Sequence, residues 1–267
     1  MAAKISIVIP SYNQALFLER AIVSVLNQQW PNLELIVMDG GSTDGSVDIL
    51  RQYDSQLTYW ESVPDRGQSH ALNKGFERAT GDLFGWLNAD DTYCDGMFEV
   101  LSQVFLTRPS VQVVFGDWFQ IDTDDLVTDY CYAFDYNYRH LVYEGFHLST
   151  QAMLWRAGLH RQFGVFQEDL HRTMDYDFLI RLGQLCGNRG FFRVAQPFCC
   201  FRRHEAQKTH MFDDALAREL AYIYATHGHE RYRELWRVFF RFRRLWWYVR
   251  RGGLRYMSRR ILERFSL

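Results

Sequence analysis

The sequence predicts an α/β fold built on a mainly parallel sheet with flanking helices. Short apolar runs alternate with helix-length segments over residues 5–115. Polar clusters follow three of these runs, at residues 11–13, 39–45 and 88–91. Such alternation produces βαβ units, and ligands of these sheets bind beyond the carboxyl ends of the strands. We therefore expect the three clusters to meet at one edge of the sheet.

The first half of the chain shows a regular series of elements. Strands are expected at residues 5–9, 33–38, 57–60, 83–87 and 111–115. Helices are expected between them at residues 18–26, 46–53, 68–79 and about 96–106, from apolar side chains at helical spacing. The first strand is expected to stop at Pro10, and Ser11 or Asn13 is expected to cap the first helix.

The second half is less regular. Residues 117–150 are rich in Asp and Tyr and predict no clear element. Helices are expected at residues 174–186 and 212–227, and short strands at 191–194 and 198–201. The remaining tail is expected to form two helices separated by Gly252 and Gly253.

Composition bounds the class of protein. The chain has 267 residues, of which 48% are hydrophobic, 16% aromatic and 23% charged, which excludes a disordered or collagen-like chain. Its five cysteines show no CxxC spacing, so neither a zinc site nor a disulfide framework is indicated, and a reducing compartment is expected. No apolar run approaches the ~20 residues of a membrane span, and a strand-like run begins where a signal peptide would lie. We expect a cytoplasmic globular protein.

The net charge of −2 hides an uneven distribution. Residues 231–267 contain twelve Arg and two Glu, a balance of +10, so the preceding residues carry −12. An acidic body with a basic, aromatic-rich tail indicates a partner for the tail.

Two adjacent carboxylates, Asp90 and Asp91, follow a predicted buried strand. Adjacent carboxylates repel each other unless they are solvated or neutralised by a cation, and Mg²⁺ or Mn²⁺ takes oxygen ligands and bridges to a diphosphate. A solvated turn that caps the next helix explains the pair equally well.

Two further segments have both a binding and a structural interpretation. Residues 39–45 (DGGSTDG) allow close backbone approach to a ligand, but they form neither a Walker loop nor a GxGxxG motif and also suit an ordinary turn. Residues 65–75 carry Arg66 and Lys74, which suit phosphates or a solvated helix surface.

Together these segments resemble the family 2 glycosyltransferases, enzymes of the Rossmann-like GT-A fold. The matching parts, in order, are residues 10–13 (PSYN), 39–44 (DGGSTD), 67–75, 86–91 (WLNADD), 174–178 (MDYDF) and 202–204 (RRH). The resemblance covers residues 4–210. It implies a GT-A domain at 1–210, with a nucleotide-sugar half (1–116) and an acceptor and catalytic half (117–210), followed by a helical extension at 211–267.

The resemblance implies a nucleotide-sugar donor, either a UDP-, dTDP- or GDP-sugar, across the carboxyl ends of the first strands. Asp39 would accept a hydrogen bond from the base, which Pro10 and Tyr12 would also contact, and Ser69 and Lys74 would lie near the ribose and diphosphate. The full set implied at the donor is Pro10, Tyr12, Asn13, Asp39, Ser69, Lys74, Asn88, Ala89, Asp90 and Asp91.

The family's DxD motif corresponds to Asn88-Ala89-Asp90. Asp90 is the implied ligand of Mn²⁺ or Mg²⁺, Asp91 supports it or contacts the sugar, and His204 is a further implied ligand. Asn88 departs from the motif. It keeps an acceptor oxygen but lowers the negative charge, so weak metal affinity is expected.

The implied catalytic base is Asp175, which would take the proton of the acceptor hydroxyl. Asp177 ranks second, because it would point elsewhere from a helix. Met174 stands where the family has Glu, and loss of that anion should lower the pKa of Asp175 unless burial offsets it. Without the resemblance, the preferred interpretation of Asp175 is a charge at a helix N-terminus, where the helix dipole favours it. Gln151 and Trp155 are implied on the acceptor side, although a buried Trp155 explains the sequence as well.

The tail has three interpretations. Arginines interleaved with Trp and Phe suit a membrane surface, on the inner face of the cytoplasmic membrane. The alternatives are packing on the body or homodimer formation, while nucleic acid is disfavoured by the acidic body.

The predicted function is an inverting, metal-dependent transfer of a sugar to a hydroxyl of a glycan or lipid-linked glycan, in bacterial surface polysaccharide assembly. The alternatives are a polyprenyl-phosphate sugar synthase and a non-catalytic protein that binds a sugar nucleotide or glycan. A nucleotidyltransferase is disfavoured because the glycine-rich phosphate loop with Lys or Arg that it would carry near the N-terminus is missing.

Overall fold

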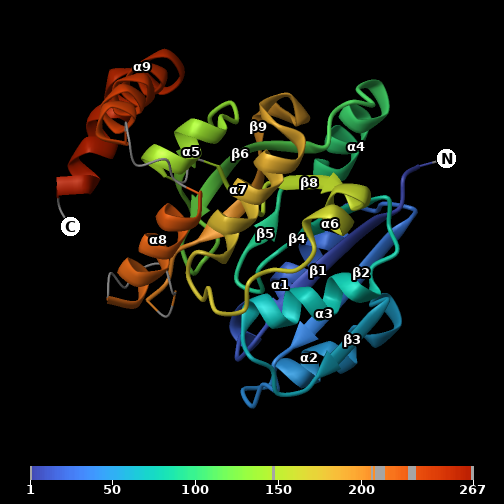
Figure 1. Ribbon diagram of the computed structural model, residues 1–267. Helices are drawn as coiled ribbons and strands as arrows, with labels where there is room; N and C mark the ends of the chain where they lie inside the picture. The colour runs from blue at the N-terminus through green and yellow to red at the C-terminus, as the bar shows by residue number, and fades with distance from the viewer. Residues whose placement is uncertain (1, 146–147, 206, 208–213, 228–232, 266–267) are drawn as a thin grey trace.

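A computed structural model describes residues 2–145, 148–205, 207, 214–227 and 233–265 (Figure 1). Its strands form a single sheet in the order β3-β2-β1-β4-β8-β6-β9-β5, with β7 paired to β6. The strands are β1 (Ile5–Ser11), β2 (Leu33–Asp39), β3 (Tyr59–Ser62), β4 (Leu83–Trp86), β5 (Thr92–Tyr93), β6 (Val113–Ile121), β7 (Val127–Cys131), β8 (Met153–Arg156) and β9 (Phe191–Arg202). The helices are α1 (Ala15–Leu26), α2 (Ser46–Gln52), α3 (Gln68–Arg78), α4 (Met97–Thr107), α5 (Tyr138–Glu144), α6 (Ala157–Phe163), α7 (Met174–Cys186), α8 (Asp214–His227) and α9 (Arg233–Phe265).

The first half of the sheet is parallel, as predicted. β1 pairs with β2 and β4, and β2 pairs with β3, all in parallel. The register places Ser11 beside Asp39, and Asp39 beside Ser62, at the carboxyl ends of three strands. β1 continues through Pro10 and ends at Ser11, two residues beyond the expected end at Ile9. The polar residues that follow these strands therefore share one edge of the sheet.

The predicted cap of α1 is wrong. The backbone N–H groups of Gln14 and Ala15 donate to Ser46 Oγ at 3.2 Å and to Asp44 Oδ2 at 2.8 Å. Asn13 has a left-handed backbone, with φ of 52°, and accepts instead from the Thr43 N–H at 3.0 Å. Residues of the loop after β2 thus cap the start of α1. These hydrogen bonds connect the loop after β2 to the loop after β1.

The second half of the sheet is mixed. β8 lies antiparallel between β4 and β6, while β6 and β9 pair in parallel. The two short strands expected at residues 191–194 and 198–201 form one continuous strand, β9. The register of β9 against β6 shifts near Asp117, so the residues between the two expected strands are part of an irregularity within β9. Residues 117–150, for which no element was predicted, supply most of β6, β7 and α5.

Helices cover both faces of the sheet (Figure 1). One core cluster joins the sheet to α3, α5, α6 and α7, and it includes the buried rings of Trp86, Trp155 and Phe178. The other joins the sheet to α1, α2 and α4. Because β1, β2 and β4 are buried on both faces, each appears in the sequence as a nearly continuous apolar run.

The C-terminal helices pack on the body instead of standing apart from it. The ring centroids of Trp236 and Tyr143 lie 6.3 Å apart, and those of Trp247 and Phe134 lie 4.1 Å apart. Arg244 Nη1 lies 2.5 Å from Glu144 Oε1 at the end of α5. Among the described helices, none combines the length and the apolar content that a bilayer crossing requires.

The prediction of two tail helices is wrong, since α9 is continuous through Gly252 and Gly253. Glycine in a helix costs roughly 1 kcal/mol relative to alanine, which weakens a helix without forbidding it. Trp247 precedes the two glycines in α9, is 8% exposed, and packs on Phe134 of the body.

Arg202, the last residue of β9, joins the two halves of the sheet. Its side chain is 0% exposed. Its guanidinium donates to Asp90 O at 2.8 Å, to Asp122 O at 2.7 Å and to Asp125 Oδ1 at 2.5 Å, while its backbone N–H donates to Asp91 Oδ1 at 2.8 Å. The turn after β4 and the loop after β6 are therefore held by one side chain.

We predict that Arg202→Met lowers the free energy of unfolding by about 3 kcal/mol, because it removes a buried charge and leaves the acceptors of Arg202 without a hydrogen-bond donor. Arg20→Met is the matched control. Arg20 bonds the same loop, at Thr123 O and Asp125 Oδ2, but it is 40% exposed. The control should lose less than about 1 kcal/mol. Urea denaturation measures both, and equal losses would contradict the role of Arg202.

Candidate active site

The loop after β2 is arranged around the carboxylate of Asp39, which is 2% exposed. Oδ2 accepts from the Ser42 N–H at 2.8 Å and from the Ser62 hydroxyl at 2.6 Å, and Oδ1 accepts from the Ser42 hydroxyl at 2.6 Å. Gly41, with φ of 84°, makes the turn possible. Asp39 is thus held rigidly, and Oδ1 accepts one hydrogen bond among the described residues, where a carboxylate oxygen can accept two.

Ser11 lies beside Asp39 at the end of β1. Its hydroxyl is buried and has no hydrogen-bond partner among the described residues. Tyr12, the next residue, is 62% exposed, whereas Pro10 is buried within the strand. A ligand at this edge would therefore meet an unpartnered hydroxyl and a free aromatic ring.

The segment before α3 forms the next wall. A Cβ added to Gly40 would lie 3.0 Å from Asp65 Oδ2, so the loops after β2 and β3 touch. Asp65 Oδ1 accepts from the Gly67 N–H at 2.7 Å. Ser69, in the first turn of α3, is 5% exposed. A contact of Ser69 with the ribose or diphosphate stays a prediction.

Lys74, expected near the diphosphate, forms an ion pair with Glu61 of β3. Arg78 lies 3.6 Å from the other oxygen of the same carboxylate. This carboxylate also accepts from the Tyr59 hydroxyl, and the basic and phenolic neighbours lower its pKa although burial opposes them. The charge of Lys74 is thus already balanced within the protein, and its role at the donor stays a prediction.

Asn88 is the junction of the turn after β4. Its Oδ1 accepts from Gln68 Nε2 at 2.8 Å, its Nδ2 donates to Asp91 Oδ2 at 3.3 Å, and its N–H donates to Gln151 Oε1 at 2.9 Å. An aspartate could not donate to Asp91. The departure from the DxD pattern therefore provides a hydrogen bond inside the turn.

Asp90 and His204 form the candidate metal pair. Asp90 Oδ2 lies 3.0 Å from His204 Nε2, and the ring of His204 lies 5.1 Å from that of Phe17. Within the described residues no group of three His, Cys, Asp or Glu side chains is placed to hold a metal. A carboxylate and an imidazole suit Mn²⁺, and such sites are commonly completed by substrate phosphates and water. Asp90 and His204 could therefore supply two ligands of a divalent cation, with the remaining positions left to a diphosphate and water.

Asp91 is separated from that pair by burial. It is 0% exposed, and both of its oxygens accept bonds from the protein, at Arg202 N and Asn88 Nδ2. Burial and the adjacent charge of Asp90 raise its pKa well above the usual range. Asp91 thus supports the turn, and Asp90 is the acid of the pair that faces His204.

α7 carries the candidate base Asp175 on its first turn. The loop before this helix is fastened to α3 and to the loop that precedes α3. Arg66 Nε lies 2.6 Å from Glu168 Oε2, and Asn73 of α3 exchanges two hydrogen bonds with the backbone of Phe166. One turn later the ring of Phe178 lies 5.2 Å from that of Trp86, the last residue of β4. These contacts hold α7 beside the loops at the carboxyl edge.

Burial raises the pKa of Asp175 to about 6, and the negative charge of Glu219 adds to this increase. The Tyr176 N–H donates to Asp175 Oδ1 at 2.8 Å and opposes it. The expectation that Met174 lowers this pKa depended on burial being small, and burial dominates instead. Asp177 is occupied elsewhere, since Arg181 lies 2.7 Å and His227 3.2 Å from its oxygens.

The two residues expected on the acceptor side differ. Gln151 is 6% exposed and holds the backbone of Asn88, so its amide shapes the turn. Trp155 is 0% exposed in β8, and its ring packs edge-on against Phe178 at 5.1 Å. Trp155 belongs to the core, because a fully buried ring cannot stack on a sugar, and the alternative interpretation of the sequence is the correct one.

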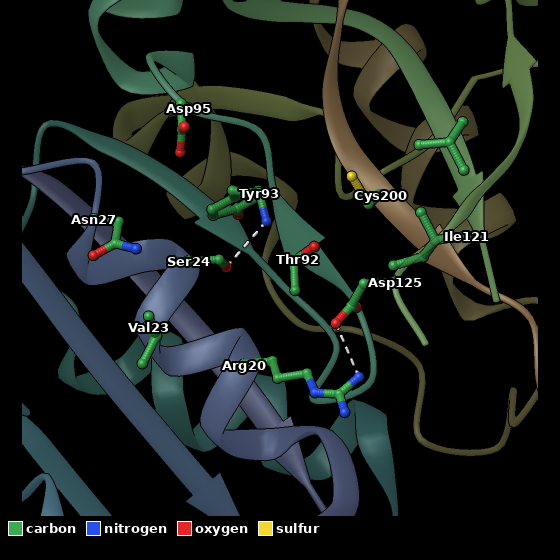
Figure 2. Close-up of a pocket in the computed structure, with 11 residues that line it drawn as sticks. Arg20, Val23, Ser24, Asn27, Thr92, Tyr93, Asp95, Ile121, Asp125 and Cys200 are labelled. Atoms are coloured by element: carbon green, nitrogen blue, oxygen red, sulfur yellow. Dashed lines mark hydrogen bonds and ion pairs between the residues drawn. The ribbon is translucent and has the colours of Figure 1, made fainter. Parts of the chain in front are cut away.

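A hollow of ≈ 330 Å³ lies elsewhere, between α1, β5 and the ends of β6 and β9 (Figure 2). None of the predicted site residues lines it. Polar groups on its wall pair with each other, as Ser24 Oγ accepts from the Tyr93 N–H at 3.0 Å and Arg20 pairs with Asp125 at 2.9 Å. Its lining therefore points to no donor contact.

The sequence did not single out several residues that shape the site. Ser11 was indicated only as part of the cluster at residues 11–13 and as a possible helix cap, and Arg202 only as part of the motif at residues 202–204. The roles of Gln68, Arg202 and Glu219 depend on partners at least 20 positions away in the chain. A buried arginine at the end of a strand and a glutamate on a surface helix have no local signature, so only their partners reveal them.

Comparison with known proteins supports the same fold. The model of the family described as Glycosyl transferase family 2 matches residues 6–163. An uncharacterized glycosyltransferase of Nostoc is 38% identical over a match that covers 42% of this chain and 35% of the Nostoc protein. An uncharacterized glycosyltransferase of Rickettsia prowazekii is 28% identical over a match that covers 73% of this chain and 60% of the Rickettsia protein. The chain thus covers less than two thirds of the length of each of these two relatives. A protein of Bacillus subtilis assigned to teichuronic acid biosynthesis is 38% identical over 39% of this chain and 42% of its own.

Solved structures agree in fold at low identity. TarS 1–349 of S. aureus in complex with UDP-GlcNAc has a TM-score of 0.69, with 15% identity over 89% of this chain and 71% of that chain. A mannosyltransferase of Pyrobaculum calidifontis in complex with GDP-Man and Mn²⁺ has a TM-score of 0.60, with 17% identity over 100% of this chain and 80% of that chain. With a family match over more than half of its length and this architecture, the chain belongs to glycosyl transferase family 2 and has the GT-A fold.

Proposed function

We propose that the protein transfers a sugar from a nucleotide-diphosphate donor to a hydroxyl of a glycan, with inversion at the anomeric carbon. The observation that supports this best is the convergence of three elements at one edge of the sheet: the Asp39 loop, the Asn88–Asp91 turn and the start of α7. The first two provide oxygen-rich loops for a donor, and the third provides a half-buried carboxylate beside them.

Asp175 would act as the general base. It accepts the proton of the acceptor hydroxyl while that oxygen forms a bond to the anomeric carbon. The bond from this carbon to the diphosphate breaks on the opposite face, and the nucleoside diphosphate leaves with the electron pair. A carboxyl with a pKa of about 6 is a stronger base than an ordinary aspartate and is still ionised at pH 7.

The donor would lie across the ends of β1, β2 and β4. The free acceptor position on Asp39 Oδ1 suits an N–H of the base, and the unpartnered Ser11 hydroxyl and exposed Tyr12 lie next to it. A divalent cation held by Asp90 and His204 would neutralise charge on the departing diphosphate. The complexes of the two solved neighbours, with UDP-GlcNAc and with GDP-Man and Mn²⁺, support a nucleotide-sugar donor and a divalent ion.

The acceptor class rests on the relatives. A teichuronic acid biosynthesis protein among them favours surface polysaccharide assembly. We propose a growing glycan, or one attached to a lipid, as the acceptor.

The α9 helix favours a membrane surface as a further partner. Its buried face holds Phe240 and Trp247, while a second apolar face is exposed, at Leu235, Val238, Phe239, Phe242, Trp246 and Val249. These exposed positions recur at helical spacing, and residues 235–262 contain nine Arg and no acid. An apolar stripe flanked by arginines suits anionic lipid headgroups, which would place the enzyme on the inner face of the cytoplasmic membrane.

We predict that Asp175→Asn lowers kcat by at least ~100-fold, because the acceptor proton loses its base, with little change in nucleotide affinity. The rate of the wild type should fall about tenfold per pH unit below pH 6, as Asp175 becomes protonated. Initial rates of donor turnover across pH measure both effects. Asp169→Asn, an exposed carboxylate on the preceding loop, is the control.

Full activity of Asp175→Asn would sink the base assignment. It would favour the polyprenyl-phosphate sugar synthase, because a phosphate acceptor is already ionised and needs no base.

We predict that one of UDP, dTDP and GDP binds with micromolar affinity in the presence of Mn²⁺ and at least ~10-fold more weakly without it, because a cation held by Asp90 and His204 would neutralise charge on the diphosphate. Asp90→Ala should abolish the metal dependence. Calorimetric titration measures each affinity. Asp95→Ala, which removes an exposed carboxylate nearby, should bind like the wild type. If Asp90→Ala retained the full effect of Mn²⁺, the proposed ligand would be wrong.

We predict that the protein sediments with vesicles of equal phosphatidylglycerol and phosphatidylcholine and not with phosphatidylcholine alone, and that the double variant Phe242→Glu, Trp246→Glu stays in solution. Leu106→Glu is the control, since Leu106 is 74% exposed on α4. Sedimentation without lipid gives the oligomeric state. Loss of a dimer in the double variant, with unchanged vesicle binding, would show that the stripe joins two copies instead.

A further inference from the structure

We infer that Glu219, on α8, is a positioning residue for Asp175. This inference rests on the proposed function, in which Asp175 is the base. It assigns part of the catalytic machinery to the helical extension, which the sequence predicted to be separate from the catalytic half.

The carboxylate of Glu219 organises the entry to α7. Oε1 accepts from the His171 N–H at 3.0 Å, and Oε2 accepts from the N–H groups of Arg172 and Thr173 at 3.0 Å each. The Thr173 hydroxyl also donates to Oε2, at 2.9 Å. One side chain from another helix thus binds three consecutive backbone N–H groups.

This arrangement replaces an ordinary helix cap. Thr173 occupies the N-cap position of α7 but makes no side-chain cap bond to its own helix, because its hydroxyl is directed to Glu219. Asp175 stands two residues later, and its orientation follows from that of the first turn. If the entry loop moved, Asp175 would move with it, and misplacement of a reacting group by about 1 Å can cost up to ~100-fold in rate.

α8 is itself fixed on α7. Glu219, Ile223 and His227 lie four residues apart on one face of α8. Ile223 is 1% exposed in the core, and His227 Nε2 lies 3.2 Å from Asp177 Oδ1. The helix is therefore attached at both ends of this face, which keeps the Glu219 carboxylate in place.

The charge of Glu219 also acts on Asp175. It raises the pKa of Asp175 in addition to burial, because a second anion nearby disfavours ionisation. The other titratable or charged groups around this turn are His171 and Arg172 in the entry loop, and the cluster of Asp177, Arg181 and His227. Of these neighbours, Glu219 is the one whose charge raises the pKa of Asp175.

Glu219→Gln tests the inference. Removing the anion favours the ionised form of Asp175, so the acid limb of kcat/KM should move to lower pH. Loss of the carboxylate that holds the entry loop should lower kcat at pH 8 about tenfold, with the KM for the donor unchanged. Asp214→Asn removes an exposed anion from the same helix and should leave the pH profile in place.

A readout independent of activity separates this inference from the proposed function. In enzyme with ¹³C-labelled aspartate side chains, the Asp175 carboxyl resonance is the one missing in Asp175→Asn. Its titration midpoint should lie near pH 6 in the wild type and lower in Glu219→Gln. If the midpoint were lower in Glu219→Gln but Asp175→Asn kept full turnover, the effect of Glu219 on Asp175 would stand. The assignment of Asp175 as the catalytic base would then be wrong.

An unchanged midpoint together with an unchanged pH profile would overturn the inference. Glu219→Asp covers the case in which Glu219→Gln does not fold. It keeps the charge but is one methylene shorter, so it should lower kcat while the acid limb stays closer to that of the wild type. Wild-type kcat in Glu219→Asp would equally overturn the positioning role.

Discussion

The structure depends on one buried cation, Arg202. Burying an arginine is costly unless every donor is satisfied, so its acceptors at Asp90, Asp122 and Asp125 must all be in place at once. Two of these acceptors are backbone carbonyls, which fixes the conformation of the chain itself. The candidate site inherits this rigidity, because the turn that presents Asp90 is held at the same point where β9 ends.

The first half of the fold was predictable because buried parallel strands produce continuous apolar runs. The strand and helix bounds there differ from the predicted ones by a few residues, as at Pro10, which continues β1 instead of ending it. The second half was not, since its strands pair across long stretches of sequence. β6 pairs with β9 about 80 residues later, and β8 lies between β4 and β6 although it follows both in the chain. No local pattern encodes such pairings.

The candidate site shows the same division. Asp39, Asp90 and Asp175 each lie in a short motif at the end of a strand or the start of a helix. The sequence therefore indicated both these residues and the elements that hold them. Trp155 was ambiguous, because an aromatic residue in a strand looks the same whether its ring is buried or exposed. Glu219 was not foreseeable, since its role consists of contacts with a loop almost 50 positions earlier.

Burial sorts the acidic residues of the site into different roles. Asp91 is fully buried, and its oxygens are consumed by Arg202 and Asn88, so it can only support the turn. Asp90 is partly exposed and faces His204, which suits a ligand. Asp175 is also partly exposed, but burial of its carboxyl raises the pKa to about 6. Carboxylates with environments this different are how one fold provides both a metal ligand and a base at the same pH. The sequence shows three aspartates, and the packing around each decides what it can do.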